Sequence, residues 1–140
     1  MAVLIDASIL IEAERGKLDL EPHVARRPDD ESFLSVITAS ELLHGVHRAA
    51  QPRLRAWRSA FVEGILDRFP VLQIDLATAR AHARVWADLA TTGTQIGPHD
   101  LWLAATCIAH GLTMVTANVR EFERIPGLRI ETWSNPEPDR

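Results

Sequence analysis

Short apolar runs alternate with longer segments of helical periodicity along this chain of 140 residues. The short runs are rich in β-branched residues and predict strands at Val3–Ile5, Phe33–Val36, Val71–Ile74, Thr113–Val115 and Leu128–Ile130. The longer segments predict helices over Ala7–Glu14, Ala39–Ala50, Pro52–Phe69, Leu76–Thr91 and Pro98–His110. Strands that alternate with helices are typical of a parallel sheet covered by helices, so the predicted fold class is α/β.

The length of the chain fits one domain, since about 140 residues bury roughly 68–70% of their unfolded surface in one core. We predict a single domain over residues 1–133 and a polar tail over 134–140, SNPEPDR, that frays. The only cysteine, Cys107, lies in an apolar helical segment and is expected to be a buried structural thiol. No apolar run approaches the ~20 residues that span a bilayer, and no basic segment precedes the apolar start. We therefore expect a soluble, cytoplasmic protein with no membrane partner.

Three carboxylates are placed by this pattern at one edge of the sheet. Asp6 follows the first strand directly, and Glu41 lies in the first turn of the helix after the second strand. Asp100 lies in the first turn of the helix that leads into the fourth strand. In a parallel sheet all three positions fall at the carboxyl edge, where open α/β sheets bind their ligands.

Each carboxylate alone has a structural explanation. Asp6 fits a helix N-cap, Thr38 with Glu41 fits a capping box, and Asp100 fits the positive end of a helix dipole. Together these explanations fail, because two carboxylates ~5 Å apart repel by roughly 3 kcal/mol at an effective dielectric of about 20. A capping bond contributes only about 1 kcal/mol. Either a cation lies between the carboxylates or one of them is protonated.

A divalent ion with oxygen ligands suits these residues. The histidines form no ligand pattern with Cys107, which argues against zinc, whereas carboxylates, an amide and water suit Mg²⁺ or Mn²⁺. Thr116 and Asn118 follow the fourth strand at the same edge and are candidates to position water or phosphate. His99, beside Asp100, either assists a proton transfer or is a hydrogen-bonded bystander.

The net charge of the chain does not decide whether the protein binds nucleic acid. A net charge of −4 argues against nucleic acid, yet Lys17 is the only lysine among fifteen basic residues, and arginine is the side chain that binds phosphate in a bidentate manner. Arg53, Arg55 and Arg58 lie close together beside Trp57. They form either a phosphate-binding surface or an ordinary solvated helix face.

Three stretches resemble one known family. VLIDASILIEA, SVITASELLHGV and IGPHDLWLAATCIAHGLTMVTANVREFERIPGLRIETW are similar to PIN-domain proteins, specifically the VapC-type toxin ribonucleases of bacterial toxin–antitoxin pairs. The resemblance implies a three-layer α/β/α fold with a parallel five-stranded sheet and cleavage of RNA. It also implies that Asp6, Glu41 and Asp100 hold a divalent metal. Many relatives have Asp at the position of Asn118, and Glu121, one helical turn further, is a candidate to substitute in part.

The resemblance further implies protein partners, namely a small antitoxin and a second copy of the chain in a homodimer. Trp57, Phe61, Ile65 and Leu66 share one face of a predicted helix and are candidates for the antitoxin docking surface. The alternative is that this face packs on the protein's own core.

Other classes of protein with an acidic site at a sheet edge require residues that can be checked against this sequence. A haloacid-dehalogenase-like phosphatase needs a second Asp where this chain has Ser8, and a response-regulator receiver needs a lysine after a late strand. A metal-dependent nuclease for flapped or structured DNA, and a non-catalytic RNA- or protein-binding module on a PIN fold, remain alternatives. Substrate choice depends on loop and groove shape, so residue types do not specify which RNA is cut or how many metal ions are held.

Overall fold

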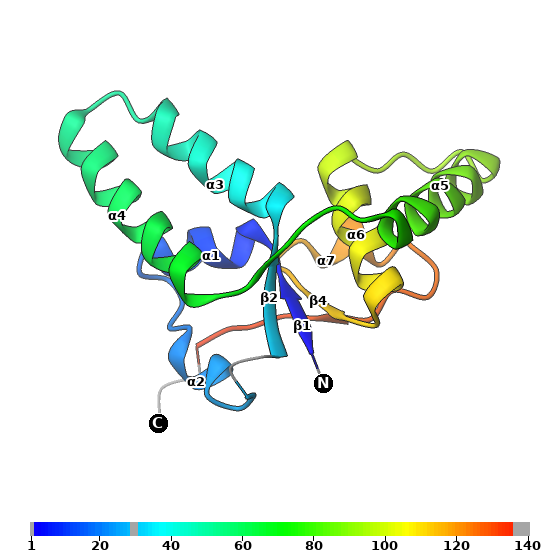
Figure 1. Ribbon diagram of the computed structural model, residues 1–140, viewed down its shortest axis with the longest axis horizontal. Helices are drawn as coiled ribbons and strands as arrows, with labels where there is room; N and C mark the ends of the chain where they lie inside the picture. The colour runs from blue at the N-terminus through cyan, green and yellow to red at the C-terminus, as the bar shows by residue number, and fades with distance from the viewer. Residues whose placement is uncertain (1, 29–30, 136–140) are drawn as a thin grey trace.

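The computed structural model describes residues 2–28 and 31–135, and in this part of the chain all strands join one parallel sheet (Figure 1). The strands are β1 Val3–Ile5, β2 Ser32–Ser35, β3 Val71–Leu72, β4 Thr113–Val115 and β5 Ile130–Glu131. Their order across the sheet is β3-β2-β1-β4-β5. The predicted parallel five-stranded sheet is confirmed.

The helices connect and cover these strands. They are α1 Ala7–Glu14, α2 Glu21–Val24, α3 Val36–Arg48, α4 Pro52–Arg68, α5 Leu76–Thr91, α6 Pro98–His110 and α7 Val119–Phe122. The predicted bounds of α1, α5 and α6 agree with the structure at both ends. Helices α2 and α7 were not predicted, because four residues are too few to show a helical period.

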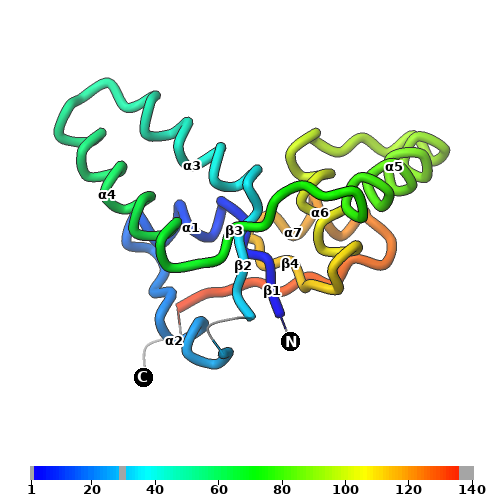
Figure 2. Tube along the Cα trace, viewed as in Figure 1, coloured from blue at the N-terminus to red at the C-terminus, as the bar shows by residue number. Residues whose placement is uncertain are grey.

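Two hydrophobic cores lie on opposite faces of the sheet. Successive β1 residues point to opposite faces, so Val3 and Ile5 belong to one core and Leu4 to the other. The first core is completed by side chains of α1, α3 and α4, and the second by side chains of α5, α6 and α7. Figure 2 shows these two groups of helices on either side of the central strands. The chain therefore has the three-layer α/β/α arrangement.

Helix α3 begins earlier than predicted. Strand β2 ends at Ser35, and the helix follows directly. The Ser35 side chain caps the helix by accepting a hydrogen bond from the backbone N–H of Ile37 at 3.0 Å. Thr38 lies inside the helix, and its buried hydroxyl has no hydrogen-bond partner within the described residues. The predicted capping box of Thr38 with Glu41 is therefore wrong, and Glu41 lies in the second turn of α3.

The C-terminal strand is displaced from its predicted position. Gly127 adopts a left-handed φ of 81°, and the turn around it delays β5, so Ile130 and Glu131 pair with Met114 and Val115. Leu128 packs instead against the core beneath α5 and α6.

The start of the predicted tail does not fray. The Asn135 side chain accepts a hydrogen bond from the backbone of Asp19 at 2.8 Å and donates one to the carbonyl of Lys17 at 3.1 Å. Residues 136–140 lie outside the described residues. A single domain over residues 1–133 stays a prediction.

The predicted docking face on α4 is largely part of the core. Ile65 is buried, and Phe61 and Leu66 pack against the core beneath α1 and α3. Only Trp57 is exposed, with 65% of its surface accessible. The helix packs on α3 and turns most of this apolar face toward the core, which favours the alternative that the face belongs to the core.

Cys107 is buried in α6, and burial disfavours the thiolate and raises its pKa to about 12. The nearby carboxylate of Asp6 acts in the same direction. The expectation of a buried structural thiol is confirmed. Across the described part of the chain, no helix combines the length and the apolar character needed to cross a membrane.

A pair of substitutions tests where α3 begins. Ser35→Ala removes the capping oxygen and should lower the free energy of unfolding by about 1 kcal/mol. Thr38→Val replaces an unpartnered buried hydroxyl with a methyl group of similar size and should be neutral or stabilising. Urea denaturation of both variants measures the difference. A larger loss for Thr38→Val than for Ser35→Ala would restore the capping box.

Candidate active site

Asp6 is fixed at the junction of β1 and β4. Its backbone N–H donates to the carbonyl of Val115 at 2.9 Å, which extends the pairing of the two strands by one residue. Its side chain is buried, and the Oδ2 atom accepts hydrogen bonds of 2.8 Å from both Ser8 and Thr116. Asp6 occupies the N-cap position of α1 but makes no side-chain capping bond. Its carboxylate instead accepts a hydrogen bond from Thr116, which follows the neighbouring strand β4.

The two hydroxyl groups are themselves held by the backbone. Ser8 Oγ accepts from the N–H of Ala117 at 3.0 Å, and Thr116 Oγ1 accepts from the N–H of Asn118 at 2.9 Å. Each hydroxyl therefore directs its proton to Asp6 Oδ2 and leaves Oδ1 without a hydrogen bond from the described residues. Sequence reasoning missed the role of Ser8, although a hydroxyl two residues after Asp6 was a visible signal.

This junction is the topological switch point of the sheet. From β1 the chain moves outward to β2 and β3 on one side, and it returns to the other side as β4 and β5. The loops after β1 and β4 therefore separate, and open α/β sheets bind ligands at such a point. Asp6 and Thr116 follow these two strands.

Glu41 and His99 join the two helical layers above the sheet edge. Glu41 Oε1 on α3 lies 3.2 Å from Nδ1 of His99 on α6. Partial burial raises the pKa of Glu41, and the negative charge of Asp6 raises it further, whereas His99 lowers it. His99 thus has a defined partner and is mostly exposed otherwise.

Asp100 carries the clearest sign of a crowded acidic site. Its pKa is raised from 3.8 to about 6, mainly by burial and then by the charges of Asp6, Glu121 and Glu41, in that order. His99 opposes it. Because charges act at this strength only over short distances, the structure brings together carboxylates that are far apart in the sequence.

The segment after β4 supplies two further groups. Asn118 is exposed just before α7, and its side chain makes no hydrogen bond to any described residue. Glu121 lies in α7, forms an ion pair of 2.9 Å with Arg124, and raises the pKa of Asp100. The segment after Asn118 is helical, so Glu121 lies in the helical turn predicted from the sequence.

The donor set fits a hydrated divalent ion. In residues 2–28 and 31–135, no three acidic, histidine or cysteine side chains converge tightly enough to hold a metal ion by themselves. Mg²⁺ retains several waters and is usually bound through one or two carboxylates, so a site of one or two acids and water does not need three converging side chains. Burial and neighbouring carboxylates raise the pKa values of Asp100 and Glu41, and a bound divalent cation would favour their ionised forms.

Comparison with known proteins identifies the family. Residues 3–128 match the family model of the PIN domain. The chain belongs to the PIN-domain family. Among PIN-domain proteins it is 36% identical over 137 residues to Ribonuclease VapC1 of Rickettsia felis, covering 96% of this chain and 98% of that protein.

Solved structures agree with this family and fold. A chain of DNA-bound VapBC from Salmonella typhimurium has a TM-score of 0.84 and 34% identity, covering 95% of this PIN-domain chain and 98% of the other. VapBC-5 from Mycobacterium tuberculosis, a member of the VapBC family of toxin–antitoxin systems, has a TM-score of 0.75 and 31% identity over 96% and 98%. The resemblance stated from the sequence is confirmed, and the chain is a VapC-type ribonuclease.

The raised pKa of Asp100 predicts how the metal-free PIN domain responds to pH. The pKa of Asp100 is above its ordinary value of 3.8 in the folded state, so its contribution to stability is present below about pH 4 and is lost as the pH rises through about 6. In EDTA, the Tm of Asp100→Asn should therefore rise relative to the Tm of the wild type as the pH increases from about 4 to about 7. Thermal unfolding of both proteins over this range measures the gain. A constant difference in Tm would contradict the electrostatic cluster.

Proposed function

We propose that this VapC-type ribonuclease hydrolyses the phosphodiester bonds of RNA with Mg²⁺ or Mn²⁺ held by Asp6 and Asp100. Glu41 binds the ion through water or orients the attacking water. The observation that carries the proposal is the acidic cluster at the switch point, in which burial and neighbouring carboxylates raise the pKa of Asp100 to about 6. When bound, the divalent ion neutralises charge on the phosphate and lowers the pKa of water.

The hydroxyl pair prepares Asp6 for this role. Ser8 and Thr116 hold Oδ2 of Asp6, so the unbonded Oδ1 is the oxygen that is free to bind a cation. Thr116 is fully buried, and its hydroxyl contacts Asp6 and the backbone of Asn118. We therefore assign Thr116 to the positioning of Asp6 rather than to the positioning of water or phosphate.

The other groups have exposed or half-buried positions around the acids. Glu41 binds the ion through water or orients the attacking water, and His99 lies 3.2 Å from its Oε1. The free side chain of Asn118 contacts water or phosphate, and Glu121 is a weaker ligand. Because Asn118 is neutral, the site has one charge fewer than it would with Asp there, which favours one tightly held ion over two.

The biological role follows from the relatives. The solved neighbours are VapBC assemblies, one of them described as a member of a family of toxin–antitoxin systems. This chain is the toxin of such a pair, acts on RNA in the cytoplasm, and is neutralised by a small antitoxin. A homodimer is the proposed state of the free protein, by analogy with the family.

The substitution Asp100→Asn tests the metal site and the reaction together. Loss of an anionic ligand should abolish metal-dependent RNA cleavage and weaken metal binding, so millimolar Mg²⁺ or Mn²⁺ should raise the Tm of the variant less than that of the wild type. Cleavage of labelled RNA and melting curves with EDTA or metal give the two readouts. The proposal fails if the variant cleaves at near wild-type rate and keeps the full shift in Tm.

Controls separate the competing functions. Asp88→Asn makes the same change at an exposed position on α5 and should leave both readouts unchanged. A DNA strand of matched sequence should stay intact, and equal cleavage of RNA and DNA would favour a structure-specific DNA nuclease. Absence of cleavage by the wild type with either metal would favour a non-catalytic binding module.

Expression in a bacterial host tests the toxin role. Induction of the wild type should arrest growth, because unneutralised cleavage of cellular RNA harms the host, whereas induction of Asp100→Asn should not. Co-expression of the neighbouring open reading frame should relieve the arrest. Colony counts measure both effects, and unrelieved arrest would exclude that frame as the antitoxin.

A further inference from the structure

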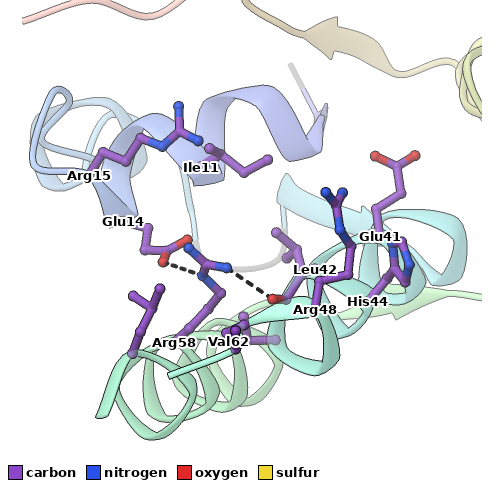
Figure 3. A pocket seen from close by; sticks show the side chains of 13 residues that line it. Ile11, Glu14, Arg15, Glu41, Leu42, His44, Arg48, Arg58 and Val62 are labelled. Carbon is purple, nitrogen blue, oxygen red and sulfur yellow. Dashed lines mark hydrogen bonds and ion pairs between the residues drawn. The ribbon is translucent and has the colours of Figure 1, made fainter. Parts of the chain in front are cut away.

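A groove with a volume of about 410 Å³ runs between α1, α3 and α4. Glu41 lines one part of it, so the groove opens onto the acidic cluster. Figure 3 shows Glu41 and Arg48 extending from α3 on one side and Ile11 and Arg15 from α1 and its end on another. A molecule bound in this groove would therefore reach the proposed site of cleavage.

The inner wall of the groove is electrically balanced. Arg58 on α4 donates to Glu14 on α1 at 2.8 Å and to the carbonyl of Gly45 on α3 at 2.9 Å, as drawn in Figure 3. Both charged side chains are mostly buried, and they link the three helices. Leu42 and Val62 supply apolar surface beside this pair. Arg58 is thus structural, as is Arg55, which donates to the carbonyl of Ala49.

The rim of the groove carries arginines of a different kind. Arg15 and Arg48 line the groove, are exposed, and make no hydrogen bond or ion pair with any residue in the described ranges. Their guanidinium groups keep all of their donors available. In a chain of net charge −4, two unpaired cations beside an acidic cluster create a local positive surface.

We propose that this groove binds the sugar–phosphate backbone of single-stranded RNA next to the scissile bond, with Arg15 and Arg48 on its phosphates. The proposal rests on the ribonuclease function proposed above. Arginine donates two parallel hydrogen bonds to a phosphate, and such contacts position a nucleic acid without reading its sequence. They also offset the repulsion between the RNA and the acidic cluster that it must approach.

Continuity with the acidic cluster favours RNA over a protein segment as the occupant. The strand that is cut has to pass Glu41, and the groove extends from Glu41 to both arginines. A phosphodiester backbone carries an anion at each nucleotide, which matches cations on more than one wall. An acidic peptide would satisfy the same arginines, and the experiment distinguishes it.

The test is the salt dependence of RNA binding. Wild type, Arg15→Gln, Arg48→Gln and the double variant are titrated in EDTA against a labelled mixed-sequence single-stranded RNA of about 16 nucleotides, with fluorescence anisotropy as the readout. Each lost phosphate contact should reduce the slope of log K against log salt by about 0.7 and weaken binding by about tenfold. Arg84→Gln, an exposed arginine on α5, is the matched control and should change neither quantity.

The outcomes separate this proposal from the ribonuclease function. If the wild type cleaves RNA and the double variant binds RNA like Arg84→Gln, the groove proposal is wrong while the ribonuclease function stands. If RNA binding is unchanged and only neutralisation by the co-expressed antitoxin is lost, the groove belongs to a protein partner and the proposal is again overturned. An unchanged Tm in each variant confirms that the fold is intact.

Discussion

Repulsion between carboxylates is the constraint on which the proposed active site depends. Asp6, Glu41, Asp100 and Glu121 come from four separate segments. Burial is the largest cause of the raised pKa of Asp100, about 6, and the charges of the other three carboxylates add to it. Such an arrangement costs stability unless a cation or a proton is present. The two hydrophobic cores supply the stability that keeps these groups together.

The parallel sheet explains how this arrangement arises. Strands β1 and β4 end at the same edge, and the change of direction between them opens a space into which Asp6 and the residues after β4 project. Hydroxyl groups from Ser8 and Thr116 then select which oxygen of Asp6 is engaged and which is free. One backbone topology therefore sets both the place of the site and the orientation of its most buried acid.

The arginines show how a protein with a net negative charge accommodates a polyanion. Arg58 and Arg55 are bound to the helices around the groove and maintain its shape, whereas Arg15 and Arg48 are unpaired at its rim. The amino-acid composition does not distinguish these two kinds of arginine. The division into structural and available cations is made by packing, and it leaves Arg15 and Arg48 available in the groove that Glu41 also lines.

The amino-acid sequence alone predicted the α/β class, the parallel sheet, the bounds of α1, α5 and α6, and the sheet edge at which the acids lie. These features follow from hydrophobic periodicity and from the geometry of parallel strands, both of which are local or topological. Tertiary structure decided the cap of α3 at Ser35 instead of Thr38, and the inward face of α4 at Ile65. It also decided that Ser8 and Thr116, which are 108 residues apart, both donate to Oδ2 of Asp6. Such contacts depend on how distant segments pack, because a hydroxyl or an apolar face acquires its partner only when the layers assemble.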